Sequence, residues 1–357
     1  MLLGALLPTL LAATIDVAPG ADPAAAIAAA RPDDTIRLAA GRHERSLGRV
    51  RAPIRIAGAG AGVTVVVAPE GEDGLVVEGG AVELEGLTLR ASGPRSALKV
   101  LGGSVRANGV SLVGGALGAY VGGGTLEASD ADLAGDEYGV LVHSGALGLD
   151  GARVRGGRAG VAQLGGRATL ARVAVTGPSA EAGVTISGGT ARLDDVVVRA
   201  PGPSGLAVTG KARVEAYALD ASGAHLQAGV LGDCVQVSRA QLSIDGGTLT
   251  RCGGAALEAF GGSVEARGLD ATGGDAGCLV FMDGADGRLQ GNRCSGRGPA
   301  VVAASGAKVA ASMNRWLADP VLWVECGSGA RVYLGVGETS REPCKNSGTS
   351  LDKPRRK

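Results

Sequence analysis

The chain has 357 residues, of which 63 are Gly, and its aromatic residues are 2 Trp, 4 Tyr and 2 Phe. Hydrophobic residues make up 45%, and 35 basic residues balance 35 acidic ones, so the composition excludes a disordered chain and gives no electrostatic basis for nucleic-acid binding. Two Phe also disfavour a large compact enzyme core, which needs more aromatic volume. The composition suits a fold that buries small aliphatic residues and turns often.

Residues 1–13 predict a secretory signal peptide, because the run MLLGALLPTLLAA is apolar, short and ends in small residues. A buried first strand is the alternative. We expect a secreted chain, and no later segment combines the length and apolarity of a membrane span. Asp22 and Pro23 then predict the start of a short helix over 24–31, with Asp22 as N-cap, that would cap the front of the fold.

A repeat of about 22 residues follows and extends to the C-terminal region. Each unit holds three short alternating segments separated by turns, as in 75–77, 82–85 and 87–89, with Gly79 and Gly80 in the first turn. A single unit cannot bury its apolar face, but stacked units pair their strands and share one core. The aligned unit positions are Leu75, Leu98, Tyr120, Val140, Val161, Val184, Leu206, Val235, Leu257, Leu279, Val301 and Val324. One longer interval predicts an inserted loop around 225–229.

Two further columns of the alignment predict side chains that line the interior. One column is Leu87, Val110, Ala131, Ala152, Val173, Val196 and Tyr217, and the other is Leu89, Leu112, Leu133, Val154, Val175, Val198 and Leu219. We therefore predict an all-β fold, a single-stranded right-handed parallel β-helix (solenoid) over 14–335, followed by a C-terminal tail over 336–357. A propeller or sandwich is disfavoured, because those folds use antiparallel strands and aromatic motifs that this chain lacks.

All Cys residues lie in the second half, and an even number in an exported chain favours disulfides over a zinc site. The simplest connectivity joins Cys234 to Cys252, Cys278 to Cys294, and Cys326 to Cys344. The last pair and the nearby rings predict a disulfide-bearing C-terminal cap over the last coil. Those rings are Trp316, Trp323 and Tyr333.

The N-terminal part resembles the beginning of right-handed β-helix proteins of the pectin-lyase-like superfamily. The residues that carry the resemblance are 15–20, 26–30, 34–38, Gly41, 53–60 and 64–66. Asp33 departs from the usual Gly, and His43 from the usual aromatic residue. The resemblance implies the fold but not an activity, because the superfamily includes lyases, hydrolases, epimerases and members without known activity.

One outward surface offers candidate residues for lyase chemistry, which needs carboxylates on Ca²⁺ and a base beside the sugar carboxylate. The alignment places Arg213 over Arg192 and Glu215 over Asp194, with the carboxylates about 5 Å apart. We take all four as candidate catalytic residues, and Asp194 and Glu215 as candidate Ca²⁺ ligands. The alternative is a solvated sheet surface of alternating charge.

Other sequence features point to chemistry less directly. A second acidic group, a further candidate for Ca²⁺, comprises Asp130, Asp132, Asp136 and Glu137. The three glycines of 58–62 match a turn before a strand, because a phosphate-binding loop must open a helix. Asp233 has no second Asp beside it in the sequence, and no His is flanked by Gly, so the polygalacturonase pattern is absent.

The outward face of the first strand in each unit is unusually apolar, which is typical of a partner site or of a surface covered by the terminal segments. Its residues are Val76, Val121, Leu141, Ala162, Ala207, Val280 and Val302. The leading hypothesis is a secreted, non-catalytic surface or binding scaffold whose partner is a polysaccharide or a cell-surface protein. The alternatives are a Ca²⁺-dependent lyase acting on acidic polysaccharide and an adhesion module that uses the apolar face. No cofactor other than Ca²⁺ is expected.

Overall fold

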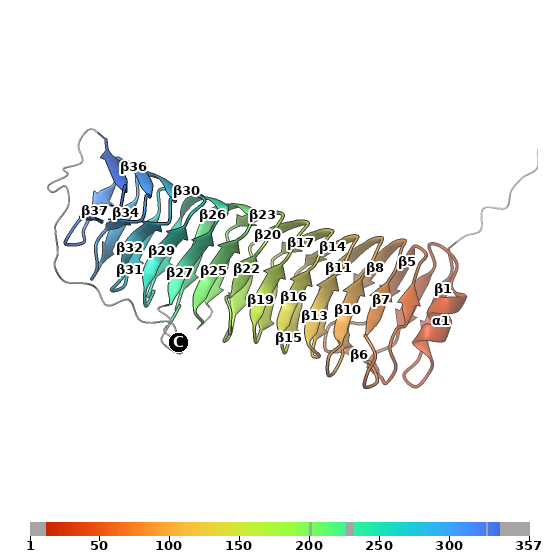
Figure 1. The fold of residues 1–357 in the computed structure, drawn as a ribbon. Coiled ribbons are helices and arrows are strands. Elements are labelled where there is room, and N and C mark those ends of the chain that lie inside the picture. Colours follow the sequence, from red (N-terminus) through yellow and green to blue (C-terminus); the bar gives the residue numbers. More distant parts are fainter. Residues whose placement is uncertain (1–11, 200–201, 226–231, 326–327, 336–357) are drawn as a thin grey trace, which may run out of the picture.

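The computed structural model describes residues 12–199, 202–225, 232–325 and 328–335, and it confirms the predicted parallel β-helix (Figure 1). The chain winds through successive coils, and each strand pairs in parallel with the equivalent strand of the next coil. Most of the predicted signal peptide and inserted loop lies outside the described residues, as do Cys326, Cys344 and the tail.

Each coil contributes one strand to a 13-stranded sheet and further strands to a 26-stranded sheet. The strands of the 13-stranded sheet are β4 (Arg49–Val50), β7 (Leu75–Val77), β10 (Ser96–Val100), β13 (Leu117–Val121), β16 (Tyr138–Val142), β19 (Ala159–Gln163), β22 (Val184–Ile186), β25 (Ser204–Thr209), β27 (Asp233–Ser238), β29 (Ala255–Phe260), β32 (Gly277–Met282), β35 (Val301–Ala303) and β38 (Leu322–Val324).

The 26-stranded sheet is built from two rows. The first row is β1 (Thr14–Val17), β2 (Thr35–Leu38), β5 (Ile54–Ala57), β8 (Ala81–Glu85), β11 (Ser104–Asn108), β14 (Thr125–Ser129), β17 (Ala146–Asp150), β20 (Arg167–Ala171), β23 (Thr190–Asp194), β26 (Arg213–Ser222), β28 (Gln241–Thr250), β30 (Ser263–Arg267), β33 (Asp286–Gln290), β36 (Lys308–Ser312) and β39 (Arg331–Leu334). The second row is β3 (Gly41–His43), β6 (Thr64–Val67), β9 (Thr88–Arg90), β12 (Ser111–Val113), β15 (Asp132–Gly135), β18 (Arg153–Gly156), β21 (Ala174–Thr176), β24 (Val197–Arg199), β31 (Asp270–Gly273), β34 (Arg293–Gly296) and β37 (Arg315–Trp316). Strands β26 and β28 are long enough to belong to both rows.

Helix α1 (Pro23–Ala29) lies at the N-terminal end of the solenoid, as predicted, although it ends two residues before Arg31 (Figure 1). The Asp22 carboxylate accepts hydrogen bonds from the backbone N–H groups of Ala24 and Ala25, at 3.0 and 3.3 Å. These bonds satisfy donors that a helix start otherwise leaves unpaired. Ile27 is buried against the first coils, so the helix covers one open end of the core.

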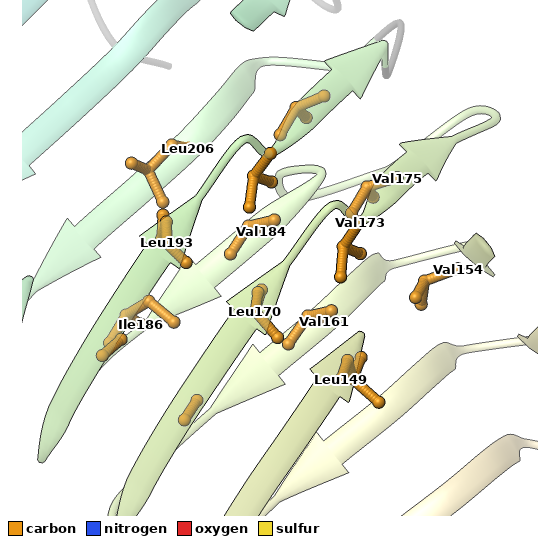
Figure 2. Close-up of a cluster of buried hydrophobic side chains, with 14 of the residues drawn as sticks. Leu149, Val154, Val161, Leu170, Val173, Val175, Val184, Ile186, Leu193 and Leu206 are labelled. Carbon is orange, nitrogen blue, oxygen red and sulfur yellow. The ribbon is translucent and has the colours of Figure 1, made fainter. Parts of the chain in front are cut away.

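The core is one continuous stack of small aliphatic side chains along the bore, as Figure 2 shows for Val161, Val184 and Leu206. All but two of the aligned unit positions occupy one buried column. The predicted alignment is wrong for Tyr120, because Ala119 occupies that column, and for Val324, because Leu322 occupies it.

The prediction is also wrong for the last members of the two interior columns, Tyr217 and Leu219. Val198 pairs with Ala221, which shifts both columns by two residues in β26. Leu219 is therefore buried, whereas Tyr217 lies on the outer surface with 37% of its area exposed.

Turns that contain glycine explain much of the glycine content. Gly145 adopts φ +85°, and a Cβ atom there would lie 2.3 Å from the carbonyl oxygen of Gly124 in the preceding coil. Only glycine avoids both the left-handed backbone strain and this contact. The turns of successive coils can therefore stack directly on one another.

Phe281 is the one Phe inside the bore, and its neighbours are small. Ala259 and Ala303 flank it in the adjacent strands, and all three side chains are fully buried. Across the bore, a Cβ atom on Gly287 would lie 2.7 Å from Cε1 of the ring. A ring fits this narrow tube only where its neighbours lack side-chain volume.

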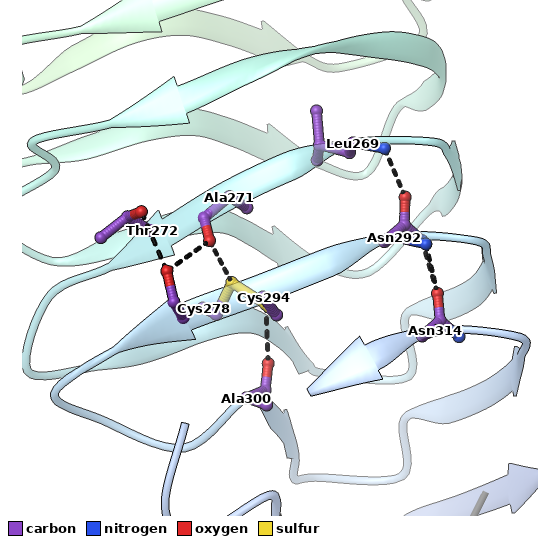
Figure 3. The surroundings of a disulfide bond; sticks show 9 residues. Leu269, Ala271, Thr272, Cys278, Asn292, Cys294, Ala300 and Asn314 are labelled. Carbon is purple, nitrogen blue, oxygen red and sulfur yellow. Dashed lines mark hydrogen bonds between the residues drawn. A yellow bond between two sulfur atoms is a disulfide. The ribbon is translucent and has the colours of Figure 1, made fainter. Parts of the chain in front are cut away.

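Two of the predicted disulfides are present, Cys234–Cys252 and Cys278–Cys294, while the third lies outside the described residues. Figure 3 shows the second disulfide together with a ladder of asparagines at the bend between the two strand rows. Asn292 is buried, accepts from the Leu269 N–H at 2.9 Å and donates to Asn314 at 2.9 Å. The ladder satisfies backbone groups that the bend leaves without sheet partners.

The aromatic plug predicted for the last coil is wrong for two of its three rings. Trp316 packs against the main core, but Trp323 packs on Val280 and Val302 at the outer face of the 13-stranded sheet. Tyr333 lies on the outer face of β39, with 55% of its area exposed.

Candidate functional site

The predicted lyase residues lie on the outer face of β23 and β26, but their register differs from the prediction by two residues. Arg192 pairs with Glu215, and Asp194 pairs with Tyr217. The turn that precedes β26 is one residue longer than the corresponding turn before β23, since Ile186 pairs with Val208 but Thr190 with Arg213. The sequences Ala-Arg-Leu-Asp and Ala-Arg-Val-Glu look equivalent, yet they are not aligned in the sheet.

Arg192 separates the two candidate carboxylates. Its Nε lies 2.7 Å from Oδ2 of Asp194, its Nη1 lies 4.0 Å from Oε2 of Glu215, and the guanidinium stacks 4.4 Å from the centre of the Tyr217 ring. The hydrogen bond to Asp194 raises the pKa of Arg192, so this arginine holds its proton and is poorly suited to act as a base. In this arrangement both carboxylates face an arginine rather than a shared cation site.

Arg213, the fourth candidate, points away from this cluster. Its Nε donates to Oε1 of Gln241 in the next coil at 2.9 Å. The structure therefore brings Arg192, Asp194 and Glu215 together and leaves Arg213 outside. In the described ranges, no group of three or more His, Cys, Asp or Glu side chains is arranged to hold a metal ion.

Arg213 and Glu215 instead form one end of a groove of about 570 Å³ on the outer face of the first strand row. We call this the polar groove. It runs across β26, β28, β30, β33, β36 and β39. The polar and aromatic side chains along it are Arg213, Glu215, Gln241, Ser243, Ser263, Glu265, Asp286, Arg288, Lys308 and Tyr333.

The hollow arises from the sizes of side chains in different coils. In one outward column Ser243 lies between Glu215 and Glu265, and Ala310 lies between Arg288 and Tyr333. In the other column Ser263 lies between Gln241 and Asp286. Because the outward positions of paired strands lie in straight columns, each short side chain leaves a hollow between the longer ones on either side.

The charges of the polar groove are unevenly neutralised. Glu265 pairs with Arg267, and Glu215 lies within ion-pair distance of Arg192. Among the residues that the structure describes, no carboxylate lies within ion-pair distance of Arg213, Arg288 or Lys308, which line the groove. Asp286 is the unpaired acidic residue there. The groove lining holds three basic and three acidic side chains, and the register places Asp286 beside Lys308 and Glu265 beside Arg288 without an ion pair to either cation.

The second acidic group does not form one cluster. Asp130 and Asp132 line another hollow, of about 980 Å³, where Asp132 lies 3.2 Å from Arg155. Glu137 lies at a different corner of the coil, 3.9 Å from Arg158. Arginines from neighbouring coils thus oppose two of these acids, as expected for a charged sheet surface.

The outer face of the 13-stranded sheet is less apolar than predicted. Val121 points inward and is fully buried, and Tyr120 takes its place in the outward column beside Lys99 and Leu141. Farther along, polar Gln236 and Glu258 interrupt the column. A compact apolar cluster remains near the C-terminal end, made of Ala255, Ala276, Val280, Met282, Val302 and Trp323.

Sequence reasoning missed a carboxyl pair formed by Asp233 and Glu258. Asp233 is only 5% exposed, accepts from the Ala255 N–H at 2.6 Å and is hydrogen-bonded to Glu258. Burial raises the pKa of Asp233. The partner comes from the next coil, so only the strand register could have found it. This pair does not line either groove, and we assign it a structural role.

Comparisons with known proteins do not assign this chain to a family. No protein-family profile and no curated protein matches the chain. Four solved structures match the chain, and three of them illustrate how low the similarity is. The catalytic domain of Agl-KA is 13% identical with a TM-score of 0.45, and the match covers 85% of this chain and 63% of that domain.

The other two are the A-module of the mannuronan C-5 epimerase AlgE6 from Azotobacter vinelandii and an alginate lyase from Paenibacillus sp. The first is 16% identical, with a TM-score of 0.34 and coverage of 85% of both chains. The second is 14% identical, with a TM-score of 0.28 and coverage of 90% of this chain and 99% of that one. Function must therefore be argued from this chain's own side chains.

Two observations bear on location. The two disulfides fit an extracellular protein, because such bonds persist in oxidising compartments. Within the described residues, no helix has the length and apolarity needed to cross a membrane.

Proposed function

We propose that the chain is a secreted, non-catalytic scaffold that binds acidic polysaccharide in the polar groove. The observation that carries this proposal is the set of three cations, Arg213, Arg288 and Lys308, that line the groove without a carboxylate partner among the described residues. Charged groups left unpaired in a groove are available to carboxylate or sulfate groups of a ligand.

The shape and polarity of the polar groove support the same ligand class. An extended sugar chain needs an open channel with hydrogen-bonding groups, and Ser243, Ser263 and Gln241 supply hydroxyl and amide groups along the floor and wall. Tyr333 supplies an exposed ring at one end, on which a sugar can stack through its C–H groups. A binding role makes use of all of these features without any catalytic group.

The lyase alternative, with Arg192, Asp194, Arg213 and Glu215, receives less support. It needs two carboxylates that face one cation and an arginine that can lose its proton. Arg192 lies between the carboxylates, and its hydrogen bond to Asp194 raises its pKa. The adhesion alternative rests on the apolar cluster around Val280 and Val302, for which the structure supplies no partner.

Binding can be measured by isothermal titration with soluble mannuronan, a linear polyuronate, and with a neutral linear glucan. We expect the protein to bind the polyuronate more tightly, with an affinity that falls as ionic strength rises. The double variant Arg288→Gln, Lys308→Gln should weaken binding by about tenfold or more. The matched control is Arg90→Gln, Arg153→Gln in the other hollow, which should bind like the wild type.

Equal weakening in the control variant would mean that binding follows overall charge and not the polar groove. Absence of binding to any acidic polysaccharide would exclude the proposed function. The same samples, incubated with Ca²⁺, test the lyase alternative through the near-ultraviolet absorbance of unsaturated products. A rise in absorbance that Asp194→Ala abolishes would favour the lyase.

A further inference from the structure

The polar groove follows the axis of the solenoid and crosses the strands. Its residues come from six strands that pair in direct succession, from β26 through β28, β30, β33 and β36 to β39. Paired strands lie about 4.8 Å apart, so the five steps from Glu215 to Tyr333 span about 24 Å. The groove is therefore long in the direction in which the coils repeat.

Across its width the polar groove is narrow. Five of the six strands contribute two outward positions that are two residues apart, such as Arg213 and Glu215 on β26, and β39 contributes Tyr333. Alternate residues of a strand are separated by about 7 Å. This width suits a single extended chain, and it leaves no room for a ligand that lies lengthwise along the strands.

The spacing of the coils also favours a ligand that lies along the solenoid axis. An extended, β-linked sugar chain advances by about 5 Å per residue, which is close to the separation of paired strands, about 4.8 Å. Successive sugars laid along the axis therefore meet equivalent positions on successive coils. In the other direction, along a strand, side chains repeat at about 7 Å and would fall out of step with the sugars.

From this match we infer that the polar groove binds its polysaccharide along the solenoid axis, with one sugar residue on each of six coils. The inference rests on the proposed function and adds the orientation and length of the ligand. Arg213 and Gln241 would bind one end, Ser243 and Ser263 would contact the middle, and Tyr333 would stack on the sugar at the other end.

The competing geometry is a small pocket at the C-terminal end. There Arg288, Lys308 and Tyr333 surround Ala310, and they could hold one or two sugars without help from the other coils. The two geometries differ in how affinity depends on ligand length, since only the axial arrangement uses the middle of the groove.

Oligomannuronates of two to eight residues, titrated calorimetrically into the full-length protein, distinguish these geometries. We expect the dissociation constant to fall by at least about tenfold from the dimer to the hexamer, as contacts add along the groove, and to change little from the hexamer to the octamer. A dimer that binds as tightly as the octamer would overturn the axial arrangement in favour of the small pocket.

A variant that blocks the middle of the polar groove gives an independent readout. Ser263→Tyr places a ring on the exposed floor, and it should weaken octamer binding about tenfold while leaving the dimer affinity unchanged. The matched control, Ser111→Tyr, makes the same substitution in the other hollow. If Ser263→Tyr binds the octamer like the wild type, the inference is wrong although the proposed function stands. If no mannuronate of any length and no polymer binds, both are wrong.

Discussion

Gly287 should be intolerant of a single added methyl group, because of the ring it faces. In Gly287→Ala the new Cβ would lie 2.7, 2.9 and 3.1 Å from Cε1, Cζ and Cδ1 of Phe281. These distances are shorter than normal carbon contacts, and the fully buried ring is flanked by Ala259 and Ala303 in rigid strands. Overpacking of this kind costs about 1–3 kcal/mol of unfolding free energy. The backbone of Gly287 adds no penalty, because its φ is not in the left-handed region.

A double-mutant cycle separates this contact from other effects. Phe281→Leu removes the ring at a cost of about 1–1.5 kcal/mol, and it should make Gly287→Ala tolerable. We expect the two changes together to cost at least about 1 kcal/mol less than their sum. Gly148→Ala is the control, because its nearest neighbour would be Cγ of Glu127 at 3.6 Å and its φ also allows Ala.

Urea unfolding, followed by circular dichroism and by the fluorescence of Trp316 and Trp323 in the C-terminal coils, measures these differences. Strictly additive costs for Gly287→Ala and Phe281→Leu would refute the reasoning, since the two side chains would then not be in contact. A loss of stability in Gly148→Ala as large as in Gly287→Ala would also refute it.

Two further predictions concern buried polar groups. Asn292→Ala should lower the unfolding free energy by about 2–3 kcal/mol, because it leaves the buried Leu269 N–H without an acceptor, whereas the exposed Asn108→Ala should change it little in the same urea assay. Asp233→Asn should stabilise the protein above acidic pH. Burial raises the native pKa of Asp233 above its unfolded value near 3.8, so the native state holds its proton more tightly and wild-type stability falls as pH rises through that interval. Thermal unfolding of both proteins from pH 3 to 8 should give a difference that grows with pH and then levels off, and a difference independent of pH would contradict this assignment.

The fold could be predicted from the sequence because the same pattern of strands and turns recurs in every repeat unit. Small aliphatic residues at matching places in each unit define the bore, and glycine-containing turns such as those at Gly124 and Gly145 mark the corners. The cap helix could be predicted as well, since Asp22 and Pro23 are local signals for the start of a helix. These features depend on neighbouring residues in the chain or on the repeat period, and both can be recognised in the sequence itself.

The candidate site was harder to predict, because it depends on the register between coils. One additional residue in the turn before β26 places Glu215 opposite Arg192 and exposes Tyr217. The polar groove likewise depends on the register, which places Ser243 beside Glu265 and Ser263 beside Gln241. Asp233 meets Glu258 in the same way. Such pairings cannot be predicted from the repeat alone where the lengths of the turns vary.

The most direct test of polysaccharide binding in the polar groove is a crystal structure of the protein with a bound oligomannuronate hexamer. We expect continuous sugar density across β26 to β39, with carboxylates against Arg288 and Lys308 and the terminal ring on Tyr333. Density on the outer face of the 13-stranded sheet, beside Glu258, with an empty polar groove would contradict it.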